Sequence, residues 1–371
     1  MRIFDTHAHY DSRQFNGDRD KLLQALHSGI NPDDITGNIG EETLVENDAK
    51  ESLGVCGCTG RGVPVKRIVN VGADMASTRT TLELAGQYDF IYAAAGVHPD
   101  SAGELIWCPE KCLKDERKHN NTENNLAVEN NVEDTEEEDP YKGITEEICL
   151  ANREELRNLA AQEKVVAIGE IGLDYHWDIW PRDVQKEAFR WQWKLAAELN
   201  LPVIIHSRDA AEDTLNMIRE FYMESTGNDV SYESLSGGKR QERPGFPRAV
   251  MHCYSYSPEH AAEYLKMGLM FGIGGVVTFK NAKKLKEVVD MLPMDRILLE
   301  TDCPYMAPDP FRGKRNNSGY LTYVAGKIAE LKGMDVEEVY TKTWENAERF
   351  FARKGNTYGN TRGSEKNDRN T

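Results

Sequence analysis

The sequence predicts an α/β fold, a single (β/α)8 barrel of the TIM type with three loop inserts. Three observations support this prediction. Short apolar and β-branched runs recur eight times, and a helical pattern follows each of them. Several of these runs are almost continuously hydrophobic, as strands are when both of their faces are covered. The chain of 371 residues is also long enough for one large barrel.

The predicted elements alternate along the whole chain. The runs expected to form strands are 2–6, 67–72, 90–97, 165–169, 202–205, 249–251, 269–273 and 296–301. The expected helices are 18–27, 75–88, 145–162, 181–199, 209–223, 258–266, 281–291, 319–331 and 337–351, the last of which closes the chain. Thr145 is a candidate N-cap, with acidic residues in the turn that follows it. A strand followed by a helix, eight times over, is typical of a parallel barrel.

Three segments interrupt this repeat, at about 29–65, 101–144 and 224–247. They are rich in glycine, serine, asparagine or acidic residues, a composition typical of surface loops or disorder. The insert at 101–144 joins a strand to its helix, so it lies on the barrel face that carries active sites. It either decorates that face or gates access to it. We expect residues 1–354 to form the barrel domain and 355–371 to be a disordered tail.

Composition limits the classes of protein that fit. The net charge of −17 argues against a broad basic surface for nucleic acid. Residues 101–150 hold 14 acidic and 5 basic residues, a net of −9 that accounts for about half of this charge. No apolar run reaches the roughly 18 residues of a membrane span, and no signal peptide is evident. Seven cysteines suit reduced thiols, so we expect a cytoplasmic protein without a membrane partner.

Metal-binding residue types follow the predicted strands. His7 and His9 are two apart at the end of the first strand, so their imidazoles point the same way. The ends of the fourth, fifth, sixth and eighth strands carry Glu170, His206, His252 and Asp302. Each residue alone has a structural explanation as a buried histidine, a turn former or a loop charge. Together they exceed the tetrahedral demand of one zinc ion, and they match two ions about 3.5–4 Å apart.

The motifs around these residues resemble the TatD family of metal-dependent deoxyribonucleases, within the amidohydrolase-like metallo-hydrolases. The matching segments are 5–9 (DTHAH), 96–99 (GVHP), 169–175 (GEIGLDY), 206–210 (HSRDA), 252–255 (HCYS), 299–305 (LETDCPY) and 312–316 (RGKRN). The match covers the chain except for the three inserts and the tail. The related amidohydrolase-like barrels tend to place a lysine at the fourth strand. Glu170 fills that place here, which favours the TatD interpretation.

The resemblance implies a role for each candidate residue. His7, His9 and Asp302 would bind one divalent ion, of zinc, magnesium or manganese. His206 and His252 would bind a second, and Glu170 would bridge the two. His98 would contact a substrate phosphate or assist proton transfer, and Asp302 would accept a proton from the attacking water. The cations expected to hold phosphate oxygens are Arg208, Arg312 and Lys314, although a surface salt bridge explains each of them equally well.

The function implied is metal-dependent hydrolysis of DNA phosphodiester bonds, with single-stranded ends degraded in the 3′–5′ direction and RNA as another substrate. Two alternatives stay open. The same barrel could hydrolyse a carboxylic ester, an amide or a D-aminoacyl-tRNA bond. A non-catalytic protein with structural metal ions would instead show closed coordination without an open water position. We expect a monomer.

Overall fold

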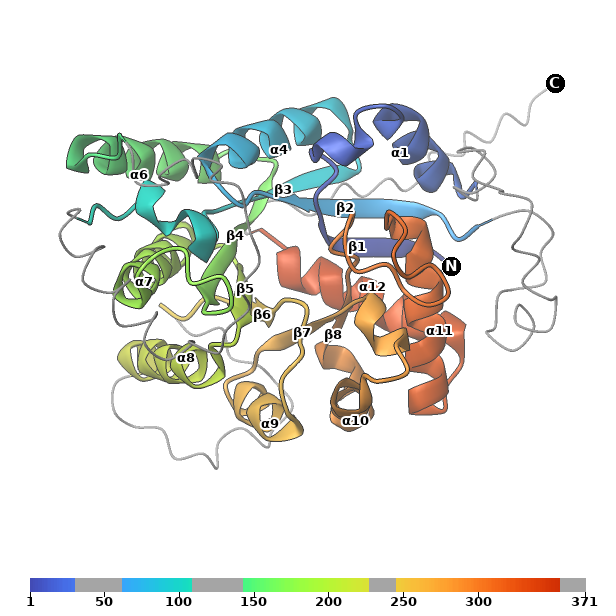
Figure 1. The fold of residues 1–371 in the computed structure, drawn as a ribbon. Helices are drawn as coiled ribbons and strands as arrows, with labels where there is room; N and C mark the ends of the chain where they lie inside the picture. Colours follow the sequence, from blue (N-terminus) through green and yellow to red (C-terminus); the bar gives the residue numbers. More distant parts are fainter. Residues whose placement is uncertain (31–61, 109–142, 227–244, 354–371) are drawn as a thin grey trace, which may run out of the picture.

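Eight parallel strands form one sheet in chain order, and the sheet curls into a barrel. The computed structural model describes residues 1–30, 62–108, 143–226 and 245–353 (Figure 1). The strands are β1 (Ile3–Ala8), β2 (Val65–Val71), β3 (Ile91–Ala95), β4 (Val165–Asp174), β5 (Val203–Arg208), β6 (Ala249–Met251), β7 (Met270–Ile273) and β8 (Ile297–Leu299). A parallel bridge between Ala8 and Cys303 joins the first strand to the segment after the last. The predicted (β/α)8 barrel is confirmed.

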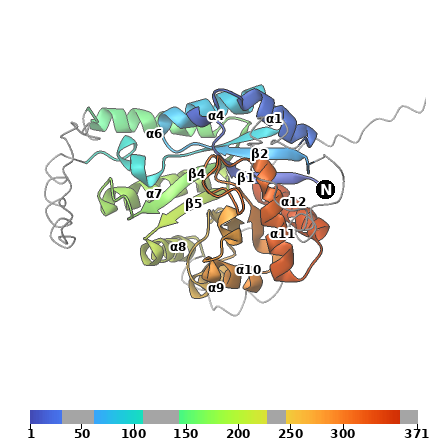
Figure 2. The ribbon, with the colours of Figure 1, turned by 45° about the vertical axis from the view of Figure 1, so that its right-hand side comes forward.

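Helices surround the strands on the outside, as Figures 1 and 2 show from two directions. They are α1 (Arg19–Ser28), α4 (Met75–Gln87), α6 (Glu146–Ala160), α7 (Arg182–Leu199), α8 (Ala211–Thr226), α9 (Pro258–Lys266), α10 (Lys283–Met291), α11 (Leu321–Lys332) and α12 (Val336–Phe351). The predicted cap of α6 is confirmed, because the side chain of Thr145 accepts the backbone N–H of Ile148. Asp74 and Ser77 form a reciprocal capping box at the start of α4.

The barrel interior is filled by apolar side chains and closed at one end by α12. Each strand contributes to this core, which also contains Trp344, Ala347, Phe350 and Phe351 of α12. The ring of Phe4, near the start of β1, lies 5.6 Å from that of Trp344 and 5.7 Å from that of Phe351. The helix therefore covers the end of the barrel where the strands begin. Polar side chains lie at the opposite end, where the strands finish.

Two strands run three or more residues further than their apolar residues predicted. β4 continues five residues past position 169, to Asp174, and β5 continues three past position 205, to Arg208. In both extensions polar residues stay in the ladder, since Asp174 pairs with Arg208. The pattern of apolar residues could not indicate this, because the ladder is held by backbone hydrogen bonds. Glu170 therefore lies inside a strand and not at its end.

Each predicted insert overlaps an observed element at one end. Residues 101–104 complete a 3-10 helix, η2 (Pro99–Glu104), residues 224–226 end α8, and residue 65 begins β2. Most of the three predicted inserts, and the predicted tail, fall on residues 31–61, 109–142, 227–244 and 354–371, outside the described residues. The domain limits and the gating role of the 101–144 insert thus stay predictions. None of the helices described is both long and apolar enough to cross a membrane.

Candidate metal centre

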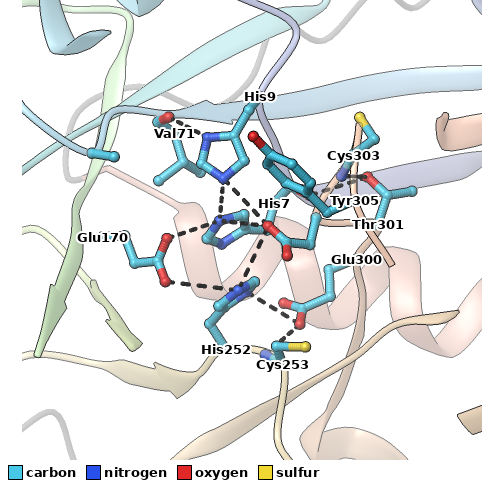
Figure 3. A network of polar contacts seen from close by, with 12 residues as sticks. His7, His9, Val71, Glu170, His252, Cys253, Glu300, Thr301, Cys303 and Tyr305 are labelled. Carbon is cyan, nitrogen blue, oxygen red and sulfur yellow. Dashed lines mark hydrogen bonds and ion pairs between the residues drawn. The ribbon is translucent and has the colours of Figure 1, made fainter. Parts of the chain in front are cut away.

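All six predicted metal ligands meet at the end of the barrel where the strands finish. They come from β1 or the residue after it (His7, His9), from β4 and β5 (Glu170, His206), and from the segments just after β6 and β8 (His252, Asp302). Figure 3 shows Glu170 facing His7 and His252 across the barrel. Parallel strands place their carboxyl ends at one rim, which is why residues nearly 300 positions apart become neighbours.

A first group of donor atoms forms around the histidine pair. The Nε2 atoms of His7 and His9 are 3.1 Å apart. Oε2 of Glu170 lies 3.4 Å from Nε2 of His7, and Oδ1 of Asp302 lies 3.3 Å from Nε2 of His9. Oδ1 of Asp302 is also 3.9 Å from Nε2 of His7. Two nitrogens and two oxygens thus converge on one small volume.

A second group forms around the other oxygen of Glu170. Its Oε1 atom lies 2.7 Å from Nδ1 of His206 and 3.8 Å from Nε2 of His252. The rings of His7 and His252 stack with their centres 3.6 Å apart, which places the two groups side by side. One carboxylate therefore faces two separate sets of histidine nitrogens, one with each oxygen.

Three of the four histidines are held by a contact at the ring nitrogen that faces away from the cluster. Nδ1 of His9 lies 2.8 Å from the carbonyl oxygen of Val71, which fixes the proton on that nitrogen. On the outer side of the other two rings are carboxylates. Nε2 of His206 lies 3.0 Å from Asp174 Oδ2, and Nδ1 of His252 lies 3.2 Å from Glu300 Oε1. Such partners leave the inner nitrogen free to bind a metal ion and fix the orientation of the ring.

The first group has the spacing that a divalent ion requires. Donors about 2.0–2.2 Å from one ion are themselves roughly 3–3.5 Å apart, and the first group has contacts of 3.1, 3.3 and 3.4 Å. Imidazole nitrogen together with carboxylate oxygen suits zinc, manganese or iron. Groups of side chains that could hold an ion, among the described residues, are His7 with His9 and Glu170, His7 with His252 and Glu300, and His98 with Asp174 and His206.

Charge balance in the cluster shifts several pKa values. Burial opposes the charged form of each group, but the neighbouring opposite charges outweigh it. The pKa of His9 rises to about 9 beside Asp302, that of His206 to about 9 beside Glu170 and Asp174, and that of His252 to about 10 beside Glu300. The same pairs hold the pKa of Glu170 well below its usual range and also lower that of Asp302. Without ions, protons on His9, His206 and His252 balance the carboxylates, whereas burial lowers the pKa of His7.

Sequence reasoning missed the two outer carboxylates. Asp174 is four residues after Glu170 on the same strand, so the period of two could have placed both on one face. Glu300 stands next to the Thr301-Asp302 pair, within a motif already singled out. A third acid, Asp5, accepts the hydroxyl hydrogens of Thr301 and Ser318 at 2.7 Å each. Asp5 thereby ties β1 to the segment after β8 and supports the rim.

His98 lies beside this cluster, at the start of η2. Its Nδ1 accepts the backbone N–H of Asp100 at 3.1 Å, so the ring proton sits on Nε2. The ring centre is 4.2 Å from that of His206. Burial, followed by the charge on His206, lowers the pKa of His98 to about 3. His98 is therefore neutral near pH 7 and offers one N–H donor.

The three predicted phosphate-binding cations differ in where they lie. Arg208, at the end of β5, is close enough to Asp100 and Cys253 for its charge to affect their pKa values. Burial raises the pKa of Asp100 to about 6 and that of Cys253 well above its usual range, and Arg208 opposes both shifts. The guanidinium of Arg312 lies 4.5 Å from the ring centre of Phe279, and Nζ of Lys314 lies 5.9 Å from that of Phe311. Neither of these two forms a hydrogen bond or ion pair with the six described ligand residues.

Comparisons with known proteins identify a family and a shared fold. A family model described as TatD related DNase matches residues 4–352. An uncharacterized metal-dependent hydrolase of Bacillus subtilis, YabD, is 38% identical over 349 residues, which cover 94% of this chain and 98% of the relative. A protein of a Rahnella strain, named 3′-5′ ssDNA/RNA exonuclease TatD, is 33% identical over 202 residues, or 53% of this chain and 69% of that protein. The crystal structure of the Escherichia coli TatD homolog YJJV has the same fold. Its TM-score is 0.61 at 23% identity, with 94% of this chain and 97% of that chain covered.

Proposed function

This chain belongs to the family of TatD related DNases, which are metal-dependent hydrolases, and on that premise we propose that it is a two-metal nuclease. Its substrate in this proposal is single-stranded DNA, degraded from the 3′ end, with RNA as a second substrate. The Rahnella relative named as a 3′-5′ ssDNA/RNA exonuclease supports the choice of polarity and of an unpaired strand. The seven cysteines suit a reducing compartment, so we place the enzyme in the cytoplasm, and we propose a monomer.

The observation that carries the proposal is the position of Glu170. Its Oε2 faces His7 at 3.4 Å, and its Oε1 faces His206 at 2.7 Å. A carboxylate with one oxygen toward each of two donor groups suits a bridge between two ions. We assign His7, His9 and Asp302 to one ion, and the histidines at 206 and 252 to the other.

The ions, when bound, would neutralise the phosphodiester charge and promote ionisation of a water molecule. The side chains supply the rest. Asp302 is the acid best placed to accept a proton, because its side chain is 21% exposed whereas that of Glu170 is 6% exposed. A group that accepts a proton from the attacking water must be within reach of it, and the more exposed carboxylate meets that condition.

Two further groups are assigned to the substrate. The Nε2–H of His98 is a neutral donor beside His206, and we assign it to a phosphate oxygen or to the leaving oxygen. Arg208 is charged and exposed at the end of β5, so its guanidinium can hold the phosphate of a neighbouring nucleotide. We assign Arg312 and Lys314, further along the loop after β8, to phosphates in the outer part of the bound DNA strand.

The test is a digestion of end-labelled single-stranded DNA by protein stripped of metal and resupplied with Mg²⁺, Mn²⁺, Co²⁺ or Zn²⁺. We expect stepwise loss of nucleotides from the 3′ end with at least one ion, and none with chelator. Asp302→Asn should abolish this release. Asp89→Asn is the matched control, because Asp89 is exposed on the connection from α4 to β3, at the other end of the barrel.

Three results would contradict parts of the proposal. Absence of nucleotide release with every ion would exclude the nuclease assignment. Equal release by the Asp302→Asn variant would remove Asp302 from its role. Hydrolysis of an aminoacyl ester or amide but of no nucleic acid would favour the alternative chemistry on the same barrel.

A further inference from the structure

Among the described residues, the loops that directly follow β4 and β8 each expose a large aromatic side chain on the barrel face that carries the metal centre. Trp177, in the loop after β4, is 61% exposed, and Tyr305, in the loop after β8, is 56% exposed. Aromatic side chains normally bury a large apolar area, so two exposed rings beside the candidate metal centre suit contact with a ligand. The catalytic roles assigned above use neither ring.

Both rings are attached to the centre through their own backbones. The N–H of Trp177 donates to Oδ1 of Asp174 at 3.0 Å, and the other oxygen of this carboxylate contacts His206. The N–H of Tyr305 donates to the carbonyl oxygen of Asp302 at 2.9 Å. Each ring thus stands three residues beyond an acid of the site, on a turn that the acid itself stabilises. Figure 3 includes Tyr305 among the residues of this network.

The strand order places the two rings on opposite sides of the site. β4 and β8 are four strands apart in a ring of eight, so the loops that follow them face each other across the mouth. The two donor groups lie between these loops, with Glu170 facing both groups. A phosphodiester bound at the centre would therefore have one aromatic ring on each side.

The surroundings of Trp177 suit a nucleotide. The guanidinium of Arg208 lies 5.6 Å from the centre of the indole, and the ring of His176 stands edge-on at 5.0 Å. A flat apolar face beside a cation can receive a base and its phosphate together. A chain of net charge −17 has little positive charge with which to hold a polyanion. Stacking provides affinity that does not depend on positive charge.

We propose, on the premise of the nuclease function above, that Trp177 and Tyr305 stack unpaired bases on the two sides of the scissile phosphate. Every base has a flat face, so such contacts tolerate any sequence. In a duplex the base faces are covered by their stacked neighbours, so this pair of rings selects single strands. The rings bind and position the substrate; they take no part in bond cleavage.

The test compares two strands with wild-type protein and variants: a short oligothymidylate, and the same strand with abasic residues at its 3′-terminal positions. The readout is the ratio of kcat/KM for the normal strand to that for the abasic strand. We expect wild type to prefer the normal strand, and Trp177→Ala and Tyr305→Ala each to lower this ratio by about tenfold, mainly through KM. Trp177→Phe and Tyr305→Phe should keep most of the preference, because they keep a ring. Met291→Ala, at an exposed apolar position on α10, is the control that keeps the wild-type ratio.

The outcomes separate this inference from the nuclease proposal. Release of nucleotides from neither strand by wild type would overturn the nuclease function itself. Release from both strands at equal rates would overturn the stacking inference alone, as would alanine variants that retain the wild-type ratio. Equal cleavage of a blunt duplex and a single strand by wild type would also overturn it, since paired bases cannot occupy both rings.

Discussion

Oδ2 of Asp174 lies 3.0 Å from Nε2 of His206, on the side of the imidazole that faces away from Glu170. The carboxylate thereby holds the ring so that Nδ1 points into the centre. Asp174 is itself fixed, because its Oδ1 accepts the backbone N–H groups of His176 and Trp177 at 2.9 and 3.0 Å. The arrangement makes the loop after β4 part of the support of the metal centre.

Removing the negative charge of Asp174 should weaken metal binding at the His206 side. We expect Asp174→Asn to lower metal affinity or activity by about 10–100-fold, the usual cost of losing an outer partner of a metal-binding histidine. Activity measured against ion concentration checks this, because added metal should restore part of the loss. The control is Asp178→Asn, in the same loop but at a residue paired with the exposed Arg182. Its activity should depend on ion concentration as that of wild type does. Identical metal curves for both variants would refute the role of Asp174.

Replacing the bridging carboxylate should have a larger effect. Glu170→Gln keeps the shape of the side chain but removes the charge that faces both donor groups. We expect fewer ions per chain than in wild type, and an activity loss that exceeds that of Asp174→Asn. Elemental analysis after gel filtration gives the stoichiometry without relying on activity. A Glu170→Gln protein that still retained two ions would rule out the bridge.

Stability of the ion-free protein should depend on pH through the cluster histidines. The folded-state pKa is about 9 for His9 and His206 and about 10 for His252, against 6.5 in the unfolded chain. A raised histidine pKa gives stability that is fully present below about pH 6.5 and lost as the pH rises through about 9 to 10. Urea midpoints measured in chelator between these limits should therefore fall with rising pH. A flat profile over this range would contradict the proton balance inferred for the cluster.

Metal binding should reverse that trend and stabilise the fold. Because ions bind only the folded chain with high affinity, each site adds about 2.7 kcal/mol when the free ion is at about 100 times its Kd. The bound ions also displace the histidine protons, so their affinity should rise as the pH rises. We expect Tm to increase by several degrees on adding the activating ion, and to return on chelation. Differential scanning calorimetry at two pH values measures both effects, and an unchanged Tm would argue against preformed sites.

Glycine at position 272 leaves the space that Glu300 occupies. A Cβ there would lie 2.0 Å from Oε2 of Glu300, so Gly272→Ala should push this carboxylate away from His252. We expect a loss of about 1–3 kcal/mol of stability, as in other overpacked cores, together with weaker metal binding. Adding Glu300→Ala should recover stability but not metal affinity. Gly86→Ala, on α4 with open space around it, is the control. Recovery of both properties would show that Glu300 has no part in orienting His252.

The sequence by itself determined the barrel, the order of its strands and the six residues that meet at its rim. Apolar runs fix which segments become buried strands, and parallel strands of a closed barrel necessarily finish at one end. A residue that follows a predicted strand could therefore be assigned to that end of the barrel before any distance between atoms was known. Glu170 was correctly placed in the group although its strand runs on to Asp174.

Only the tertiary structure decided which atoms face one another. The outer carboxylates Asp174 and Glu300, the direction of each oxygen of Glu170 and the exposure of Trp177 and Tyr305 all depend on side-chain orientation across strands. Those orientations follow from backbone hydrogen bonds and local bends that no pattern of apolar residues records. The physical reason is that the pattern of apolar residues indicates which segments are buried. Contacts between polar groups are instead set by the three-dimensional path of the chain.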